Sequence, residues 1–138
     1  DAGADVLETN TFGANRVVLT EYGLQNRVAE INTAAVKLAR QAAAKREGVR
    51  VCGSMGPGTK LALLNQITVD ELAASYAEQA TALINAGVDL LVLETCQDLL
   101  QVKTALVACY DVMRQLGKEV PVMVSVTVET TGTVIVSS

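Results

Sequence analysis

The chain has 138 residues, enough for one domain, and half of them are hydrophobic, which excludes wholesale disorder. Its 11 basic and 15 acidic residues give a net charge of −4, and this acidic balance, with one Phe and no Trp, argues against nucleic-acid binding. The sequence contains no His, which excludes Ser-His-Asp and Cys-His mechanisms and every histidine metal site within it.

The predicted elements alternate between strand and helix along the chain. In order they are a strand at 4–10, a helix at 25–47, a strand at 49–54, a helix at 69–86, a strand at 88–95, a helix at 98–116 and a strand at 120–128. The strands are apolar at successive positions, as in a parallel sheet buried on both faces, and the helices are amphipathic. This order predicts an α/β fold, and the apolar stretch at 133–137 is a candidate fifth strand.

Two segments, 2–10 and 86–96, repeat one pattern: a glycine, an aspartate, an apolar strand and a final Glu-Thr pair. Polar groups at the carboxyl ends of repeated β/α units favour a (β/α)₈ barrel, with an open doubly wound sheet as the alternative. A barrel needs eight strands and about 250 residues. Residues 1–138 are therefore interpreted as one partial domain, and the missing initial Met leads us to expect a piece of a longer polypeptide.

Carboxylates at the predicted strand ends are the first candidates for a site. Glu94, between an apolar strand and Thr95-Cys96, is the strongest, either to pair with an ammonium group or to act as a general base. Glu8 and Glu129 fit a surface role better than a functional one. The single phenylalanine, Phe12, lies in a polar loop, where it either lines a ligand or packs on the rim.

The glycine-rich loop at 53–60 does not match a P-loop, because Thr59 separates its last glycine from Lys60. We interpret it as a tight turn over the mouth of the sheet rather than as a substrate contact. The cysteines at 52, 96 and 109 form neither a disulfide framework nor a zinc ligand set, and each is interpreted as structural. They favour a reducing cytoplasm, and no uncharged run is long enough to span a membrane.

Five longer motifs carry a family resemblance. They are ADVLETNTFGAN (4–15), VCGSMGPGTKL (51–61), ITVDEL (67–72), AGVDLLVLETCQDLLQ (86–101) and PVMVSVTVETTGT (121–133). In this order and spacing they closely resemble the homocysteine-binding domains of cobalamin-dependent methionine synthases. The resemblance implies a (β/α)₈ barrel, of which this chain is about strands 2 to 5. It also implies transfer of a methyl group from methylcobalamin, recharged by 5-methyltetrahydrofolate, to the zinc-activated thiol of homocysteine, giving methionine.

Position by position, the resemblance implies substrate-binding roles for Glu94, Thr9 and Phe12. Glu94 matches a glutamate that holds the amino-acid part of homocysteine, as a carboxylate opposite an ammonium would, and Thr9 and Phe12 match the loop that shares this task. The family's zinc thiolates follow strands 6 and 8. We therefore expect no catalytic residue and no zinc ligand in this chain, and we expect it to be inactive alone, with neither zinc nor cobalamin bound.

The expected partners are homocysteine and the folate, cobalamin and reactivation domains of the same polypeptide. Two alternatives remain open from the sequence: a cobalamin-independent homocysteine methyltransferase using a sulfonium or betaine donor, and a non-catalytic amino-acid-binding half barrel. A phosphate-handling aldolase-type barrel is disfavoured, because no predicted strand ends in a Schiff-base lysine and the glycine-rich loop is not a P-loop. A part-barrel also has open sheet edges and uncovered apolar surface, so we expect the isolated chain to associate.

Overall fold

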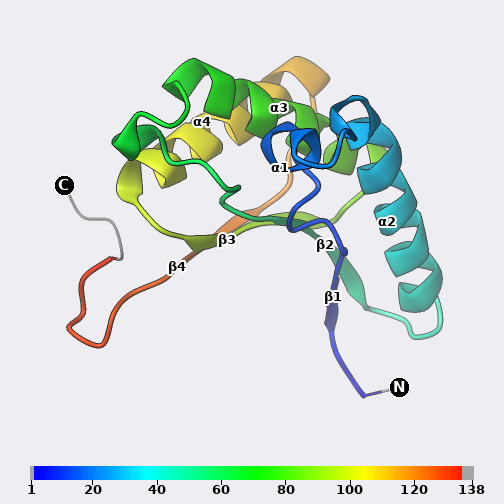
Figure 1. Cartoon of the computed structure of the whole chain (residues 1–138). Coiled ribbons are helices and arrows are strands. Elements are labelled where there is room, and N and C mark those ends of the chain that lie inside the picture. Colours follow the sequence, from blue (N-terminus) through cyan, green and yellow to red (C-terminus); the bar gives the residue numbers. More distant parts are fainter. Residues whose placement is uncertain (1, 135–138) are drawn as a thin grey trace.

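A computed structural model describes residues 2–134, which form a four-stranded parallel sheet in the order β1-β2-β3-β4 (Figure 1). The strands are β1 (Val6–Glu8), β2 (Arg50–Met55), β3 (Leu90–Cys96) and β4 (Val122–Val126). The helices are α1 (Arg16–Thr20), α2 (Val28–Ala43), α3 (Val69–Ala86) and α4 (Leu99–Leu116), with 3₁₀ turns η1 (Gln25–Arg27) and η2 (Ala62–Leu64). All four predicted strands and all three predicted helices are present in the predicted order. The bounds of α3 are the predicted ones, β2 and β3 each end one residue later than predicted, and the other elements are shorter.

The helices lie on one side of the sheet, and its other side is open (Figure 1). A doubly wound sheet carries helices on both faces, whereas a (β/α)₈ barrel carries them only on the outside. The arrangement therefore decides between the two alternatives that the sequence left open. It is that of a partial barrel, whose open side corresponds to the barrel interior.

The hydrophobic core lies between the sheet and the helices. Val51 and Met55 of β2 and Leu91 and Leu93 of β3 are fully buried there, together with Leu83 of α3. Side chains alternate between the two faces of a strand, so these positions fix which residues point to the open side. Gly53 also faces the helices, because a Cβ atom there would lie 2.9 Å from Leu91 Cδ2 and 3.1 Å from Leu83 Cδ1.

Local signals set the ends of the long helices. Thr68 and Glu71 form a complete capping box at the start of α3, and Asp98 caps α4 by accepting a hydrogen bond from the Gln101 amide at 2.7 Å. Both helices end at a glycine in the left-handed conformation, Gly87 and Gly117. In the part of the chain that the structure describes, no helix is both long and apolar enough to cross a bilayer.

Two details differ from the sequence predictions. The predicted helix at 25–47 begins as the 3₁₀ turn η1 and ends at Ala43, and the short helix α1, capped by Asn15, was not predicted. Five residues are too few to show a helical period. The candidate strand at 133–137 lies largely outside the described residues, and Val134 forms an antiparallel bridge back to Val128.

Candidate functional site

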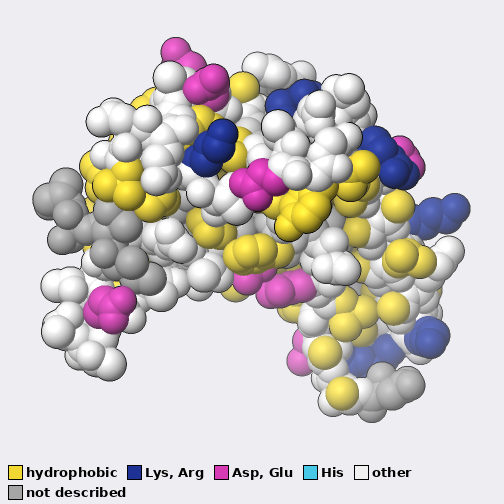
Figure 2. Space-filling model, in the orientation of Figure 1, with side chains coloured by type: hydrophobic (Ala, Val, Ile, Leu, Met, Phe, Trp, Pro, Cys, Tyr) yellow, Lys and Arg dark blue, Asp and Glu magenta, His cyan; other side chains and the backbone are white. Residues whose placement is uncertain are grey.

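The candidate site lies on the open side of the sheet, at the carboxyl ends of its strands. Figure 2 shows the molecule hollowed on this side, with acidic side chains along the hollow. Because Leu91 and Leu93 face the helices, strand alternation turns Glu94 toward the open side, as it does Ser54 of β2. Glu94 is half-buried, and Ser54 is only 2% exposed.

Three buried residues link β1 to β2 through a closed ring of hydrogen bonds. The Ser54 amide donates to Thr9 Oγ1 at 3.1 Å, and the Thr11 hydroxyl donates to the Ser54 carbonyl oxygen at 2.6 Å. The hydroxyl oxygens of Thr9 and Thr11 lie 2.6 Å apart. Since Thr11 has already used its only hydrogen, Thr9 is the donor in this third bond. Each member of the ring is thereby held in one orientation.

Glu94 is joined to this ring by a single hydrogen bond. The Ser54 hydroxyl donates to Glu94 Oε1, in a short contact across β2 and β3. A hydrogen bond to a charged acceptor is stronger than one between neutral groups. The bond connects the best candidate carboxylate to the ends of the two preceding strands.

Strand β3 carries an irregularity next to Glu94. Leu93 pairs with Val124 and Cys96 pairs with Val126, so β3 has one residue more than β4 over this stretch. The extra residue is Thr95, which is exposed and has a φ of 59°. A β-branched residue in the left-handed region is strained, and bulges often occur at barrel rims and beside active sites. The bulge turns Cys96, rather than Thr95, into the core.

The loops after β1 and β2 lie against each other. The Gly56 amide donates to the Phe12 carbonyl oxygen at 3.0 Å, and a Cβ atom at Gly56 would lie 2.8 Å from that same oxygen. Only glycine permits this approach, which gives the glycine-rich loop a close-packing role, as the sequence suggested. Phe12 itself is 45% exposed.

Two glutamines and a tyrosine hold these loops from the helices. Gln79 of α3 donates to the Thr11 carbonyl oxygen at 2.7 Å, and Gln101 of α4 donates to that of Pro57 at 2.6 Å. The Tyr76 hydroxyl donates to the Gly56 carbonyl oxygen at 3.2 Å. Sequence reasoning missed these residues. The signal was the presence of glutamines on helix faces that are otherwise apolar, since a buried polar side chain needs a partner.

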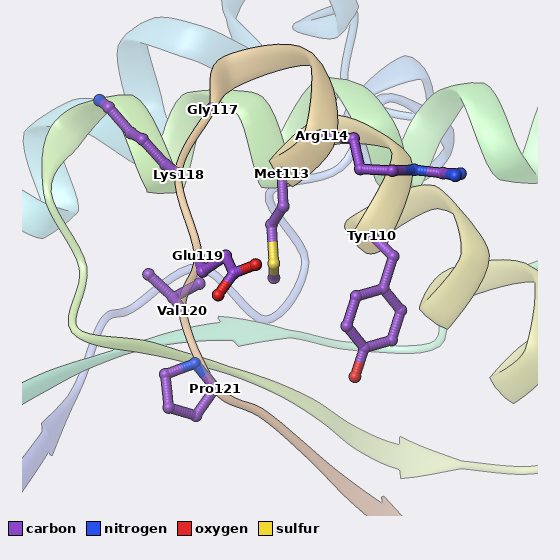
Figure 3. Close-up of a pocket in the computed structure, with 8 residues that line it drawn as sticks. All are labelled: Tyr110, Met113, Arg114, Gly117, Lys118, Glu119, Val120 and Pro121. Atoms are coloured by element: carbon purple, nitrogen blue, oxygen red, sulfur yellow. The ribbon is translucent and has the colours of Figure 1, made fainter.

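The other two candidate carboxylates take no part in the hydrogen bond between Ser54 and Glu94. Glu8 is exposed, and its partner in the strand register is Cys52 of β2, which lies two residues before Ser54. Glu129 belongs to the exposed turn after β4, where its amide donates to the Thr133 carbonyl oxygen at 2.7 Å. A separate cavity of about 1060 Å³, lined by Met113 and Pro121 among others, opens where α4 leads into β4 (Figure 3). It is therefore at the amino end of β4, away from the strand ends that carry the candidate site.

The three thiols are buried and unpaired by disulfides. Burial, followed by the charges of Glu8 and Glu94, raises the pKa of Cys52 to about 11. Burial, followed by the charge of Asp98, raises the pKa of Cys96 to about 11, and burial alone raises that of Cys109 to about 12. A thiol must ionise to bind a metal ion. Within residues 2–134, no three acidic or thiol side chains come together to hold one.

Comparison with known proteins gives consistent results. The sequence model of the homocysteine S-methyltransferase family matches residues 1–137. The whole chain is 40% identical to the methionine synthase of Mycobacterium leprae (strain TN) and 39% identical to that of Mycobacterium tuberculosis (strain H37Rv). It spans 12% of the length of either relative.

Among solved structures, the fold matches the homocysteine methyltransferase MmuM from Escherichia coli. The metallated form superposes with a TM-score of 0.66 and 22% identity over 87% of this chain and 46% of that chain. The apo form superposes with a TM-score of 0.67 and 21% identity over 97% of this chain and 48% of that chain. At this level of identity the likeness shows the fold.

Proposed function

The chain belongs to the homocysteine S-methyltransferase family, and we propose that it is part of the homocysteine-binding barrel of a methionine synthase. The proposed reaction is transfer of a methyl group from methylcobalamin to the thiol of homocysteine, giving methionine. Identity of 40% along the whole chain to a methionine synthase supports this choice over a cobalamin-independent enzyme. Residues 1–138 would form one partial domain, and the other domains of the same polypeptide would be its partners.

The observation that carries the proposal is the placement of Glu94. Its carboxylate lies on the open side of the sheet at the strand ends, where ligands bind in barrels of this kind. We assign it to the ammonium group of homocysteine, because a carboxylate in a partly desolvated mouth attracts a cation more strongly than one in water. Phe12, which is exposed in the loop after β1, would line the substrate's apolar part.

Thr9 receives a different task in this proposal. Its side chain is 4% exposed, and its only hydroxyl hydrogen is given to Thr11. The hydroxyl group therefore has no hydrogen left to donate to a ligand. We propose that Thr9 contributes by fixing the loop that follows β1, on which Phe12 is carried.

The family implies zinc and cobalamin, and the described residues do not form a zinc site. They bring together no suitable group of ligands, and their thiols are held neutral by burial. We propose that the zinc ligands and the cobalamin-binding and folate-binding domains belong to other parts of the polypeptide, and that it works in the reducing cytoplasm, where free thiols persist.

The reaction is tested on the full-length protein that contains this chain. Homocysteine is supplied with methylcobalamin, with a sulfonium donor or with betaine, and methionine is measured. We expect methionine with methylcobalamin. Formation only with the sulfonium or betaine donor would identify a cobalamin-independent enzyme. Homocysteine binding without any methyl transfer would identify a non-catalytic binding module.

The role of Glu94 is tested by Glu94→Gln, which keeps the shape and removes the charge. Hydrogen bonds to charged groups contribute about 1.5–3 kcal/mol, so we expect the KM for homocysteine to rise about 10- to 100-fold. Glu47→Gln is the matched control, since Glu47 is exposed in the turn between α2 and β2. An unchanged KM in Glu94→Gln would contradict the assignment.

A further inference from the structure

We propose that Ser54 is the positioning residue for Glu94: it holds the carboxylate by one oxygen and leaves the other free for the substrate's ammonium group. This inference rests on the proposed function, and it adds a residue that the sequence did not single out. Ser54 acts through Glu94, and it is not itself assigned a contact with substrate.

Every hydrogen-bond donor of Ser54 is already in use. Its hydroxyl has one hydrogen, and that hydrogen is donated to Glu94 Oε1. Its amide hydrogen goes to Thr9 Oγ1, and its carbonyl oxygen accepts from Thr11. Ser54 therefore has no donor left for a ligand. Its effect on binding must be transmitted by the carboxylate that it holds.

Ser54 is held rigidly by its surroundings. The residue is 2% exposed, lies within a strand that pairs with a neighbour on both sides, and closes the ring with Thr9 and Thr11. Thr11 is held in turn by Gln79, whose amide donates to its carbonyl oxygen at 2.7 Å. A glutamate has several rotatable bonds, and fixing one costs free energy during binding. Because Ser54 is fixed and holds Glu94, the glutamate side chain is already ordered before the substrate binds.

Glu94 uses only one of its two carboxylate oxygens in hydrogen bonding within the described residues. Among residues 2–134, Ser54 is the only side chain that makes a hydrogen bond to Glu94, and it does so at Oε1 alone. The second carboxylate oxygen remains available on the open side. The strained residue Thr95 follows directly, and its bulge ends the regular alternation of β3 at Glu94. Backbone strain of this kind persists where the surrounding structure holds a side chain in a functional orientation.

The test is a double-mutant cycle in the full-length protein, with steady-state methyl transfer to homocysteine as the assay. We expect Ser54→Ala to raise the KM for homocysteine about tenfold and to change kcat less than about twofold. Ser54→Thr retains the hydroxyl and should restore the KM. In a Glu94→Gln background, Ser54→Ala should change the KM less than about twofold, because the group that it positions has lost its charge.

Ser75→Ala is the matched control for removal of a buried hydroxyl. Ser75 of α3 is also buried, its Oγ has no hydrogen-bond partner, and it is remote from the open side. The Ser75→Ala variant should leave the KM for homocysteine unchanged. An equal effect of Ser54→Ala in the wild-type and Glu94→Gln backgrounds would show that Ser54 acts independently of Glu94 and would overturn the proposal.

The cycle also separates this inference from the proposed function. If Glu94→Gln raises the KM and Ser54→Ala does not, positioning by Ser54 is wrong and the role of Glu94 stands. If Glu94→Gln leaves the KM unchanged, the ammonium contact is wrong, and positioning fails with it.

Discussion

The hydroxyl of Thr11 completes two contacts in a region from which water is excluded. It donates to the Ser54 carbonyl oxygen and accepts from Thr9, and Thr11 is only 1% exposed. Thr11→Val keeps the shape of the side chain. It leaves the Ser54 carbonyl oxygen without its donor and the Thr9 hydroxyl hydrogen without its acceptor. A buried unsatisfied polar group costs about 1–3 kcal/mol, so we expect a loss of stability of that size.

The loss is measured as a lower midpoint of denaturant unfolding in the protein that contains the complete barrel. Thr81→Val is the control, because the Thr81 hydroxyl only bonds back to the Ala77 carbonyl oxygen within α3. That carbonyl group lies in the helix interior and keeps its backbone partner. Equal destabilisation by the two changes would contradict a special role for the ring.

The buried thiols give a prediction about pH. Burial raises the pKa of Cys109 to about 12, whereas the pKa of a thiol in an unfolded chain is about 8.5. The folded state therefore keeps its proton where the unfolded state has lost it. The stability contributed by the neutral thiol is fully present below the unfolded pKa and declines as the pH rises toward the folded value.

We expect the stability of the barrel to fall between about pH 8.5 and about pH 12, and to fall less steeply in Cys109→Ala. Native Cys109 should also be alkylated far more slowly at pH 8 than an unfolded thiol, since only the thiolate reacts. Rapid alkylation of the folded protein at pH 8 would contradict the burial of this side chain.

At the scale of elements, β2 packs against α3 through a position that has no side chain. A Cβ atom at Gly53 would come within 2.9 Å of Leu91 Cδ2 and 3.1 Å of Leu83 Cδ1. Overpacking of a dense core costs about 1–3 kcal/mol, and we expect Gly53→Ala to destabilise by this amount. Thermal unfolding measures it, with Gly13→Ala as the control, where the nearest atom would be 3.4 Å away. An unchanged thermal stability of Gly53→Ala would contradict this prediction, because it would show that the helix and strand separate easily.

The elements were predictable where one residue pattern had one structural meaning. The capping box at Thr68 and the glycines at 87 and 117 define the ends of α3 and α4, and the apolar runs define the strands. The extra residue at Thr95 was not predictable, because a bulge depends on the partner strand as well as on its own sequence.

The candidate site was predictable only in part. Glu94 was expected at the end of a strand, and the structure places it there. Its link to Ser54 depends on the register between β2 and β3, which pairs Ser54 with Val92 and cannot be read from either strand alone. The supporting role of Gln79 likewise depends on the path of a loop 68 residues away in sequence.

At the scale of the molecule, both outer strands are open. Among residues 2–134, β1 and β4 each pair on one side only, and Met123, Val124 and Val126 of β4 are exposed. Unpaired strand edges and apolar patches promote association. We therefore expect the isolated 138-residue chain to sediment as oligomers or aggregates in analytical ultracentrifugation. A monomer that unfolds cooperatively would contradict this expectation.

The central claim is that Glu94 receives the ammonium group of homocysteine on the open side of the sheet. It is tested by equilibrium binding of homocysteine and of 4-mercaptobutanoate, which lacks the amino group, to the full-length protein and to its Glu94→Gln variant. We predict that the wild type prefers homocysteine by at least about tenfold, as a charged hydrogen bond implies, and that the variant loses this preference. An equal preference in the two proteins would contradict the account.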